Sequence, residues 1–395
     1  MTQSTATSLL VIAVVAVSAP VLSELLRTLR IPSVLFELAL GIVIGPAVLG
    51  LAETGPFIDG LSTLGLAVLF FVAGYELDLD RIKGGPLNRA GTGWVITVAL
   101  ALLTASVMVM TGFVLSELLI ALALTTTALG TLMPMLRDRG LLESSFGNDM
   151  LAAGAFGEFA PVVAVTLFLG TSSPTAEGIL LILFVIVALG LARIAARPKP
   201  PRIVEAMTRN LETSSQLPVR VVMLLVTVMV LMATFLGIDM LLGAFAAGLI
   251  GRVLFPPDES TRLMAKVESI GYGFLIPVFF IVSGMKFDLD ALTSDPATLA
   301  RVPLFLGLFL VLRGAPALIV YRRALDGRRR AALAVLQSTA LPLLVVITEI
   351  GLATDNMLPA NAAALVGAGM LSVLVFPLVG FKILGDPQPA VTAPA

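Results

Sequence analysis

The sequence predicts an all-α membrane protein with about thirteen transmembrane helices, arranged as two inverted repeats of six helices each. Composition is the first observation behind this prediction: of the 395 residues, 58% are hydrophobic and 13% are charged, against roughly 25% charged residues in an ordinary soluble domain. The second is a series of long apolar runs, and the third is a pair of motifs that recur after 210 and 212 residues. Composition and runs indicate the membrane class, and the motifs indicate the repeat.

Each apolar run is long enough to cross about 30 Å of hydrocarbon at about 1.5 Å per helical residue. The expected helices lie near residues 7–26, 32–52, 58–77, 90–113, 115–136, 148–170, 177–195, 218–235, 237–255, 265–286, 300–321, 330–350 and 360–382. We expect residues 1–385 to form a single transmembrane domain and residues 386–395 a short tail. The sequence has no phosphate-binding loop, so no soluble nucleotide-binding domain is predicted.

Loop charges predict the orientation of the chain. Most lysine and arginine residues fall in one alternate set of loops, with clusters at 81–89, 193–209 and 322–330, whereas the other set carries mainly acidic residues such as Glu53 and Glu117. By the positive-inside rule, the N-terminus lies outside and the C-terminus lies in the cytoplasm of a multi-pass cell-membrane protein. The net charge is −1 and the basic residues are scattered, so we expect membrane lipids, and no nucleic acid, as partners.

The chain has no cysteine and no histidine. It therefore offers no disulfide framework, thiol nucleophile, imidazole base or usual zinc ligand. We expect no cofactor and no enzymatic activity. A sensor or an intramembrane enzyme is a further alternative, but the enzyme would need a second catalytic group beside a buried carboxylate, and the predicted helices supply none.

Two motifs indicate that the halves of the chain repeat each other. Residues 74–80 (GYELDLD) recur at 284–290 (GMKFDLD), and residues 127–130 (TALG) recur at 339–342 (TALP). The matches pair the third predicted helix with the tenth and the fifth with the twelfth. A shift of seven helices is odd, so the halves have opposite topology, which is typical of secondary transporters. We expect the first repeat at about 7–170, a linking helix at about 177–195 and the second repeat at about 218–382.

Hydroxyl groups beside glycine or proline occupy the middle of the fifth and twelfth predicted helices. The residues concerned are Thr126, Thr127, Ala128, Gly130, Thr339 and Pro342. Because proline removes a helical hydrogen bond and glycine loosens the helix, we expect both helices to be broken at mid-membrane and to cross there. Their carbonyl and hydroxyl oxygens would then face a site for a small cation. Kinks that serve only helix packing are the alternative.

Glu158 is a charge near the middle of the sixth predicted helix, about 15 Å from its start at helical rise. Thr127 is expected at the same depth. A charge there costs at least about 2.5 kcal/mol, and intramembrane carboxylates usually mark ion or proton pathways. We expect Glu158, with Thr126, Thr127 and Gly157 beside it, to bind either a monovalent cation or a proton. A glutamate kept neutral or paired inside the bundle is the alternative.

Two further charged residues are candidates. Arg313 is the only charge between Arg301 and Arg322, near the middle of the eleventh predicted helix. We expect it to compensate charge, either by keeping Glu158 ionised or by stabilising the ends of the broken helices; a purely structural counter-ion is the alternative. Asp149, at the cytoplasmic start of the sixth helix, either caps that helix, or interacts with the helix dipole, or attracts cations into a cytoplasmic funnel.

At these residues the sequence resembles the monovalent cation:proton antiporter-2 family, the Kef-like and Nap-like branch of the sodium/proton exchanger superfamily. The most specific stretches are 127–130, 136–140, 157–161, 279–288 and 341–351. The resemblance implies a homodimer in which a core domain of helices 4–6 and 11–13 moves like an elevator against a dimerisation domain. It also implies that helices 5 and 12 are the crossed pair, that Glu158 binds the ion and that Arg313 is the basic residue of helix 11.

The chain departs from this family at the site. Electrogenic members of the family carry two adjacent carboxylates where this chain has Gly157 and Glu158, and we expect no carboxy-terminal nucleotide-binding domain like that of Kef-like proteins. One carboxylate predicts exchange of one Na⁺ or K⁺ for one H⁺, which is electroneutral. Proton- or sodium-coupled transport of a small organic anion, with Arg313 binding its carboxylate, is the alternative.

Overall fold

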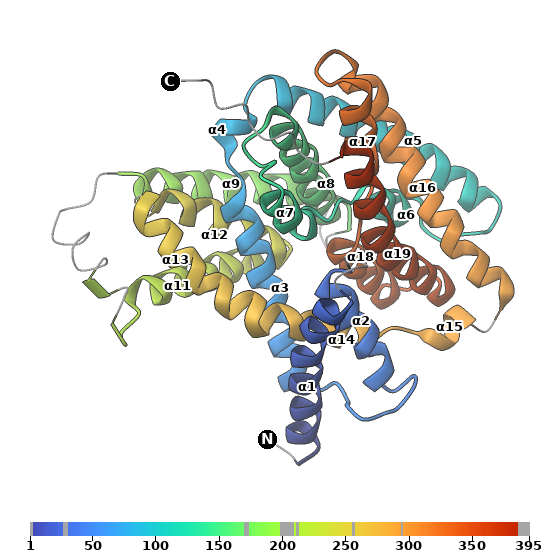
Figure 1. The fold of residues 1–395 in the computed structure, drawn as a ribbon, viewed down its shortest axis with the longest axis horizontal. Helices are drawn as coiled ribbons and strands as arrows, with labels where there is room; N and C mark the ends of the chain where they lie inside the picture. The colour runs from blue at the N-terminus through green and yellow to red at the C-terminus, as the bar shows by residue number, and fades with distance from the viewer. Residues whose placement is uncertain are drawn as a thin grey trace. The chain divides into compact units, whose positions relative to one another are not determined.

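The computed structural model describes residues 3–26, 31–169, 174–197, 209–210, 213–254, 257–293 and 295–385. Within these ranges the regular structure is entirely helical, with no strand (Figure 1). Nine helices in the described ranges are long and apolar enough to cross a membrane, and four shorter apolar helices accompany them. The predicted all-α membrane class is therefore confirmed. The predicted tail at 386–395 lies outside the described residues.

Contacts divide the chain into two compact units, the first drawn from Met1–Arg27, Phe36–Asp78 and Val162–Phe287. Its helices are α1 (Gln3–Leu25), most of α2 (Ser33–Ile44), α3 (Pro56–Glu76), α9 (Pro174–Ala195), α11 (Leu217–Phe235), α12 (Met240–Leu254), α13 (Pro257–Ile270) and α14 (Ile276–Met285). Helix α3 packs closely against α12 and α14. A Cβ atom on Gly248 of α12 would overlap the carbonyl oxygen of Phe71, so this close approach needs glycine.

The second unit is drawn from Thr28–Leu35, Leu79–Pro161 and Asp288–Ala395. Its helices are α4 (Leu79–Ile82), α5 (Gly85–Met110), α6 (Glu117–Thr125), α7 (Leu129–Asp138), most of α8 (Ser145–Leu169), α15 (Leu289–Thr293), α16 (Pro296–Val320), α17 (Gly327–Leu336), α18 (Pro342–Ala353) and α19 (Pro359–Leu384). Helix α16 packs against α5, α17 and α19.

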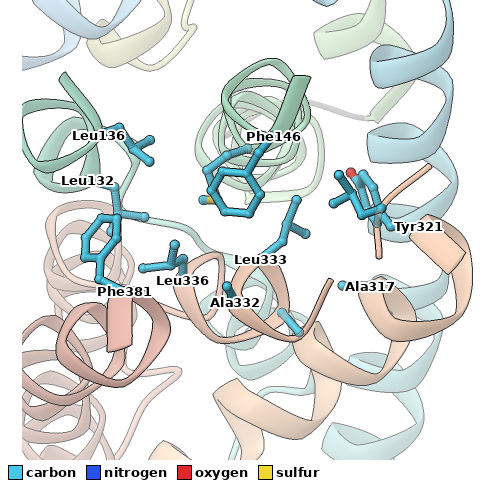
Figure 2. Packing of buried hydrophobic residues seen from close by; sticks show 12 residues of the cluster. Leu132, Leu136, Phe146, Ala317, Tyr321, Ala332, Leu333, Leu336 and Phe381 are labelled. Atoms are coloured by element: carbon cyan, nitrogen blue, oxygen red, sulfur yellow. The ribbon is translucent and has the colours of Figure 1, made fainter. Parts of the chain in front are cut away.

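A buried apolar cluster holds several helices of the second unit together (Figure 2). It includes Leu132 of α7, Phe146 of α8, Leu333 of α17 and Phe381 of α19. Each such side chain contributes about 1.5–3 kcal/mol when it is fully buried. Segments far apart in the sequence are thus joined into one body.

The observed helices confirm the two predicted interruptions, in the fifth and twelfth helices, and depart from the prediction in the second and tenth. The second predicted helix, 32–52, ends at Ile44 because Gly45 and Pro46 follow, and proline cannot continue the helix ladder. The fifth is interrupted at 126–128, between α6 and α7, and the twelfth at 337–341, between α17 and α18. A π turn, η2 (Gly271–Leu275), joins α13 to α14 within the tenth.

Candidate functional site

Residues 126–128 form the first break, and they turn their backbone away from their own helix. The N–H of Thr127 donates to the carbonyl oxygen of Gly157 in α8 at 2.9 Å. The N–H of Ala128 donates to the carbonyl oxygen of Thr339 at 2.8 Å. The first break is therefore tied by its main chain both to α8 and to the second break.

A proline in α8 explains why Gly157 can accept this bond. In an α-helix the carbonyl of residue 157 would normally accept from the N–H of residue 161. Residue 161 is Pro161, which has no N–H. The carbonyl oxygen of Gly157 is thereby left for an outside donor, and Thr127 supplies it.

Residues 337–341 form the second break, which α19 supports. The N–H of Ala340 donates to the hydroxyl oxygen of Ser372 at 2.9 Å, and that hydroxyl lies 3.0 Å from the carbonyl oxygen of Ala340. Pro342 occupies the first turn of α18, where its missing N–H costs no hydrogen bond. The hydroxyl of Ser372 thus accepts the N–H of Ala340 and lies within hydrogen-bond distance of two carbonyl oxygens, those of Ala340 and Gly369.

Arg313 of α16 lies where the two breaks meet, and its side chain is only 3% exposed. Its Nε donates to the carbonyl oxygen of Gln337 at 2.7 Å, its Nη1 to the carbonyl oxygen of Thr125, and its Nη2 to the hydroxyl oxygen of Thr127. Thr125 ends α6 and Gln337 follows the end of α17. Helix C-termini carry partial negative charge, so this guanidinium stabilises the ends of both broken helices.

Gln337 in turn donates a hydrogen bond to Arg313. Its side-chain Nε2 donates to the carbonyl oxygen of Arg313 at 2.6 Å, while its own carbonyl oxygen also accepts the hydroxyl of Thr127 at 2.9 Å. Arg313 and Gln337 are therefore locked by two hydrogen bonds of opposite direction. No role was predicted for Gln337 or Ser372; an amide and a hydroxyl inside apolar runs were the available signals.

Gly157 leaves space for this arrangement. A Cβ atom at residue 157 would overlap the hydroxyl oxygen of Thr127 and lie 2.7 Å from Nη2 of Arg313. The next residue, Glu158, is 1% exposed. The structure thus brings Gly157, Thr127 and Arg313 together in the second unit, one residue from the buried carboxylate.

The other residues expected at the breaks are placed as follows. Ala128 and Thr339 bond to each other through their main chains. The hydroxyl of Thr126 donates to Ala123 of its own helix at 3.0 Å. Gly130 lies in the first turn of α7, just beyond the break. The hydroxyl oxygen of Thr339 is buried and makes no hydrogen bond to any residue that the structure describes.

Asp149 does not cap α8, so that interpretation is wrong. Helix α8 begins at Ser145, and the preceding Ser144 is the cap, since its hydroxyl oxygen accepts the N–H of Gly147 at 3.0 Å. Asp149 belongs to the second turn and is 2% exposed.

Asp149 instead forms an ion pair with Arg89 of α5. Both Nη2 and Nε of Arg89 donate to Oδ1 of Asp149, at 2.6 and 3.1 Å. The guanidinium also lies 5.9 Å from the ring centre of Tyr321 in the segment that follows α16. Arg89 therefore connects three elements of the second unit. Its partner Asp149 lies about 14 Å from Glu158 along α8 at helical rise.

Comparisons with known proteins identify the family. Residues 12–384 match the family described as sodium/hydrogen exchanger, transmembrane. YjbQ of Bacillus subtilis is 27% identical over 97% of this chain and 64% of its own length, so this chain spans about two thirds of that relative. The Na⁺/H⁺-K⁺ antiporter GerN of Bacillus cereus is 28% identical over 72% of this chain and 73% of its own.

A solved structure supports the fold. The sodium proton antiporter MjNhaP1 of Methanocaldococcus jannaschii superposes with a TM-score of 0.67 over 95% of this chain and 97% of its own, at 18% identity. The match of the family across residues 12–384 covers nearly the whole sequence. The chain therefore belongs to the transmembrane sodium/hydrogen exchanger family.

Proposed function

We propose that this protein exchanges a monovalent cation, Na⁺ or K⁺, for a proton across the membrane. The observation that carries the proposal is the meeting of two broken helices with α8 and Arg313 at one buried point, one residue from Glu158. Membership of the sodium/hydrogen exchanger family and the similarity to GerN, a Na⁺/H⁺-K⁺ antiporter, support it.

Glu158 is the group that alternates between the two substrates. Its buried carboxylate takes either a proton or a cation, and the hydroxyl and carbonyl oxygens of Thr126 and Thr127 complete the cation's ligands. Binding of one excludes binding of the other. Competition for one carboxylate couples the two fluxes in opposite directions.

The surroundings of Gly157 support a one-for-one, electroneutral exchange. Thr127 and Arg313 fill the space that a side chain at this position would need. A second carboxylate beside Glu158 therefore has no place without displacement of the guanidinium. One exchanging carboxylate accounts for one proton or one monovalent cation per cycle.

The bonds of Arg313 argue against the organic-anion alternative. Each of its three nitrogen atoms already donates to an oxygen atom of the two breaks. Recognition of a substrate carboxylate would have to break these bonds at the crossing. Arg313 is better suited to hold the broken helices than to bind a substrate.

The grouping of the helices into two units supports an elevator-type mechanism. We place this mechanism in a homodimer whose protomers are built from inverted repeats. The second unit contains α5–α7, most of α8 and α16–α19, which are the helices that the family resemblance assigns to the moving core. The first unit would then be the static part, with the dimer interface. The proposed orientation has the N-terminus outside and the C-terminus in the cytoplasm.

The test is a proteoliposome assay with an internal pH dye and gradients of Na⁺, K⁺ or Li⁺. Glu158→Gln keeps the size of the side chain and removes its charge, so we expect exchange to be abolished. Glu143→Gln is the matched control, because the carboxylate of Glu143 is 83% exposed in the same unit. Exchange at the normal rate in Glu158→Gln contradicts the assignment, and a rate that follows an imposed membrane potential contradicts electroneutrality.

A further inference from the structure

A small cavity lies in the second unit between α5, α8, α16 and the end of α17. Its volume is about 10 Å³, room for about one water molecule. The polar residues that line it include Trp94, Arg313, Tyr321 and Gln337, and the remainder of the lining is mainly alanine and glycine. It therefore borders Arg313 from the side of α5.

Two buried polar atoms of this lining need a partner. The indole Nε1 of Trp94 and the hydroxyl of Tyr321 are buried and make no hydrogen bond to any residue in the described ranges. Tyr321 is 1% exposed, and Figure 2 shows it at the edge of the apolar cluster, near Ala317. A buried polar group without a partner is unfavourable, and a water molecule commonly supplies one.

Arg313 has N–H groups that its bonds to the two breaks do not use. A guanidinium carries five N–H groups in a fixed fork. Three hydrogen bonds join Arg313 to the two breaks, which leaves two N–H groups beside the cavity. Buried charges are stable only when they are well hydrogen-bonded, so a further acceptor here is favourable.

We propose that the cavity is a binding site for a single water molecule, which accepts hydrogen bonds from Arg313 and Trp94 and donates one to Tyr321. Water fits the volume and can both accept and donate hydrogen bonds. Trp94 and Arg313 offer only N–H donors, which do not bind a cation. The water completes the hydrogen bonding of Arg313 and so helps hold the crossing in place. Its role in exchange rests on the proposed function; its presence does not.

Trp94 makes the site measurable, because it is the only tryptophan in the sequence. An indole N–H bonded to water emits at longer wavelength and gains intensity in D₂O. Gly93 also lines the cavity, and a Cβ atom there would meet no atom within 4 Å. Gly93→Ala therefore adds a methyl group to the wall of the cavity without a clash. Gly307→Ala is the control, since its Cβ also meets nothing, α16 gains the same helix propensity and Gly307 does not line the cavity.

With the full chain in lipid nanodiscs, we expect Gly93→Ala to move the emission of Trp94 to shorter wavelength and to reduce its D₂O effect, and Gly307→Ala to change neither. Tyr321→Phe, which keeps the ring, should shift the emission in the same direction by a smaller amount and serves if Gly93→Ala does not fold. Unchanged emission in both variants overturns the water site. Emission that changes when gluconate replaces chloride also overturns it, because the occupant is then an anion.

Exchange assays on the same variants test the role of the water. We expect Gly93→Ala and Tyr321→Phe to slow exchange roughly tenfold relative to Gly307→Ala, the size expected for weakening one hydrogen bond to a charged group. Equal rates in all three variants overturn this role. Glu158→Gln should abolish exchange without moving the emission of Trp94, so a failure of the transport assignment is distinguishable from a failure of the water site.

Discussion

The two breaks face the same problem, a helix interrupted in a buried environment; they share Arg313 and differ in their other partners. The first break, 126–128, is bound to α8, the helix of Glu158, through Thr127 and the carbonyl oxygen of Gly157. The second break, 337–341, is bound to α16 and α19 through Arg313 and Ser372. Both must satisfy backbone groups that have lost their helical partners.

This difference separates the substrate site from its support. The first break contains Thr126 and Thr127, the proposed ligands, and the bond from Thr127 to Gly157 ties it to the residue before Glu158. The second break contains Gln337, which forms the reciprocal pair with Arg313. Changes at the first break should therefore alter ion binding, and changes at the second should mainly alter stability.

Arg313→Ala has the largest expected effect, because it removes the group shared by both breaks. The carbonyl oxygens of Thr125 and Gln337 would lose a charged donor inside the unit. We expect the free energy of unfolding to fall by roughly 3–5 kcal/mol, the cost of breaking a buried charged interaction. Thermal unfolding in detergent measures this, with Arg329→Ala as the control at an exposed position. Equal stability in both variants would show that the crossing does not need the guanidinium.

Gly157→Ala should disturb the first break directly and Arg313 beside it. The added methyl group would overlap the hydroxyl oxygen of Thr127 and press on Arg313, at a cost of about 1–3 kcal/mol for overpacking. Exchange should fall at least roughly tenfold. Gly154→Ala, one turn earlier, is the control, because its nearest obstacle is the flexible end of Leu129 at 2.5 Å. The proposed fit is refuted by normal exchange in Gly157→Ala.

Ser372→Ala and Thr127→Val compare the breaks directly. Ser372→Ala leaves the backbone of Ala340 without its partner, and we expect a loss of about 1–3 kcal/mol in stability with no change in apparent cation affinity. Thr127→Val removes a hydroxyl that bonds both Arg313 and Gln337, and should weaken cation affinity as well. Titrations of Na⁺ and K⁺ at fixed pH distinguish the two. A change of apparent cation affinity in Ser372→Ala would contradict the proposed division of roles between the two breaks.

Asp326→Asn has the smallest expected effect and probes the helix that leads into the second break. The backbone N–H of Arg329 bonds to Asp326 at the start of α17 and lowers the pKa of its carboxyl below the ordinary 3.8. A lowered folded-state pKa adds stability above the unfolded-state pKa, which is lost as pH falls through the folded-state value. Asparagine also caps helices but does not titrate there. The unfolding temperature of the unmodified protein should therefore exceed that of Asp326→Asn at neutral pH, and the two should converge as the pH falls. Parallel curves would exclude a contribution from the Asp326 carboxylate.

Sequence patterns predicted the interruptions and the residues near them, since a charge inside an apolar run or a proline after hydroxyl residues is a local signal. Glu158, Arg313, Thr127 and Thr339 were all found in this way. Arg313 and the two threonines indeed lie in or beside the meeting of the breaks. The function of Glu158 remains a prediction.

The partners of these residues were not predictable, because they depend on which helices face one another. Gln337, Ser372 and Arg89 act across helices, at separations that no periodicity reveals. The role of Pro161 could have been predicted from the sequence, since a proline four residues after Gly157 leaves the carbonyl of Gly157 without its helical donor. The grouping of Leu79–Pro161 with Asp288–Ala395 is likewise a property of contacts between distant segments.

The bond from Ala128 to Thr339 is made by main-chain atoms at both ends. No side chain takes part, so substitutions that fit the buried space at either residue keep both the donor and the acceptor, with one exception. Proline at residue 128 would remove the donor itself. The link between the two breaks therefore does not depend on the identity of the side chains that it joins.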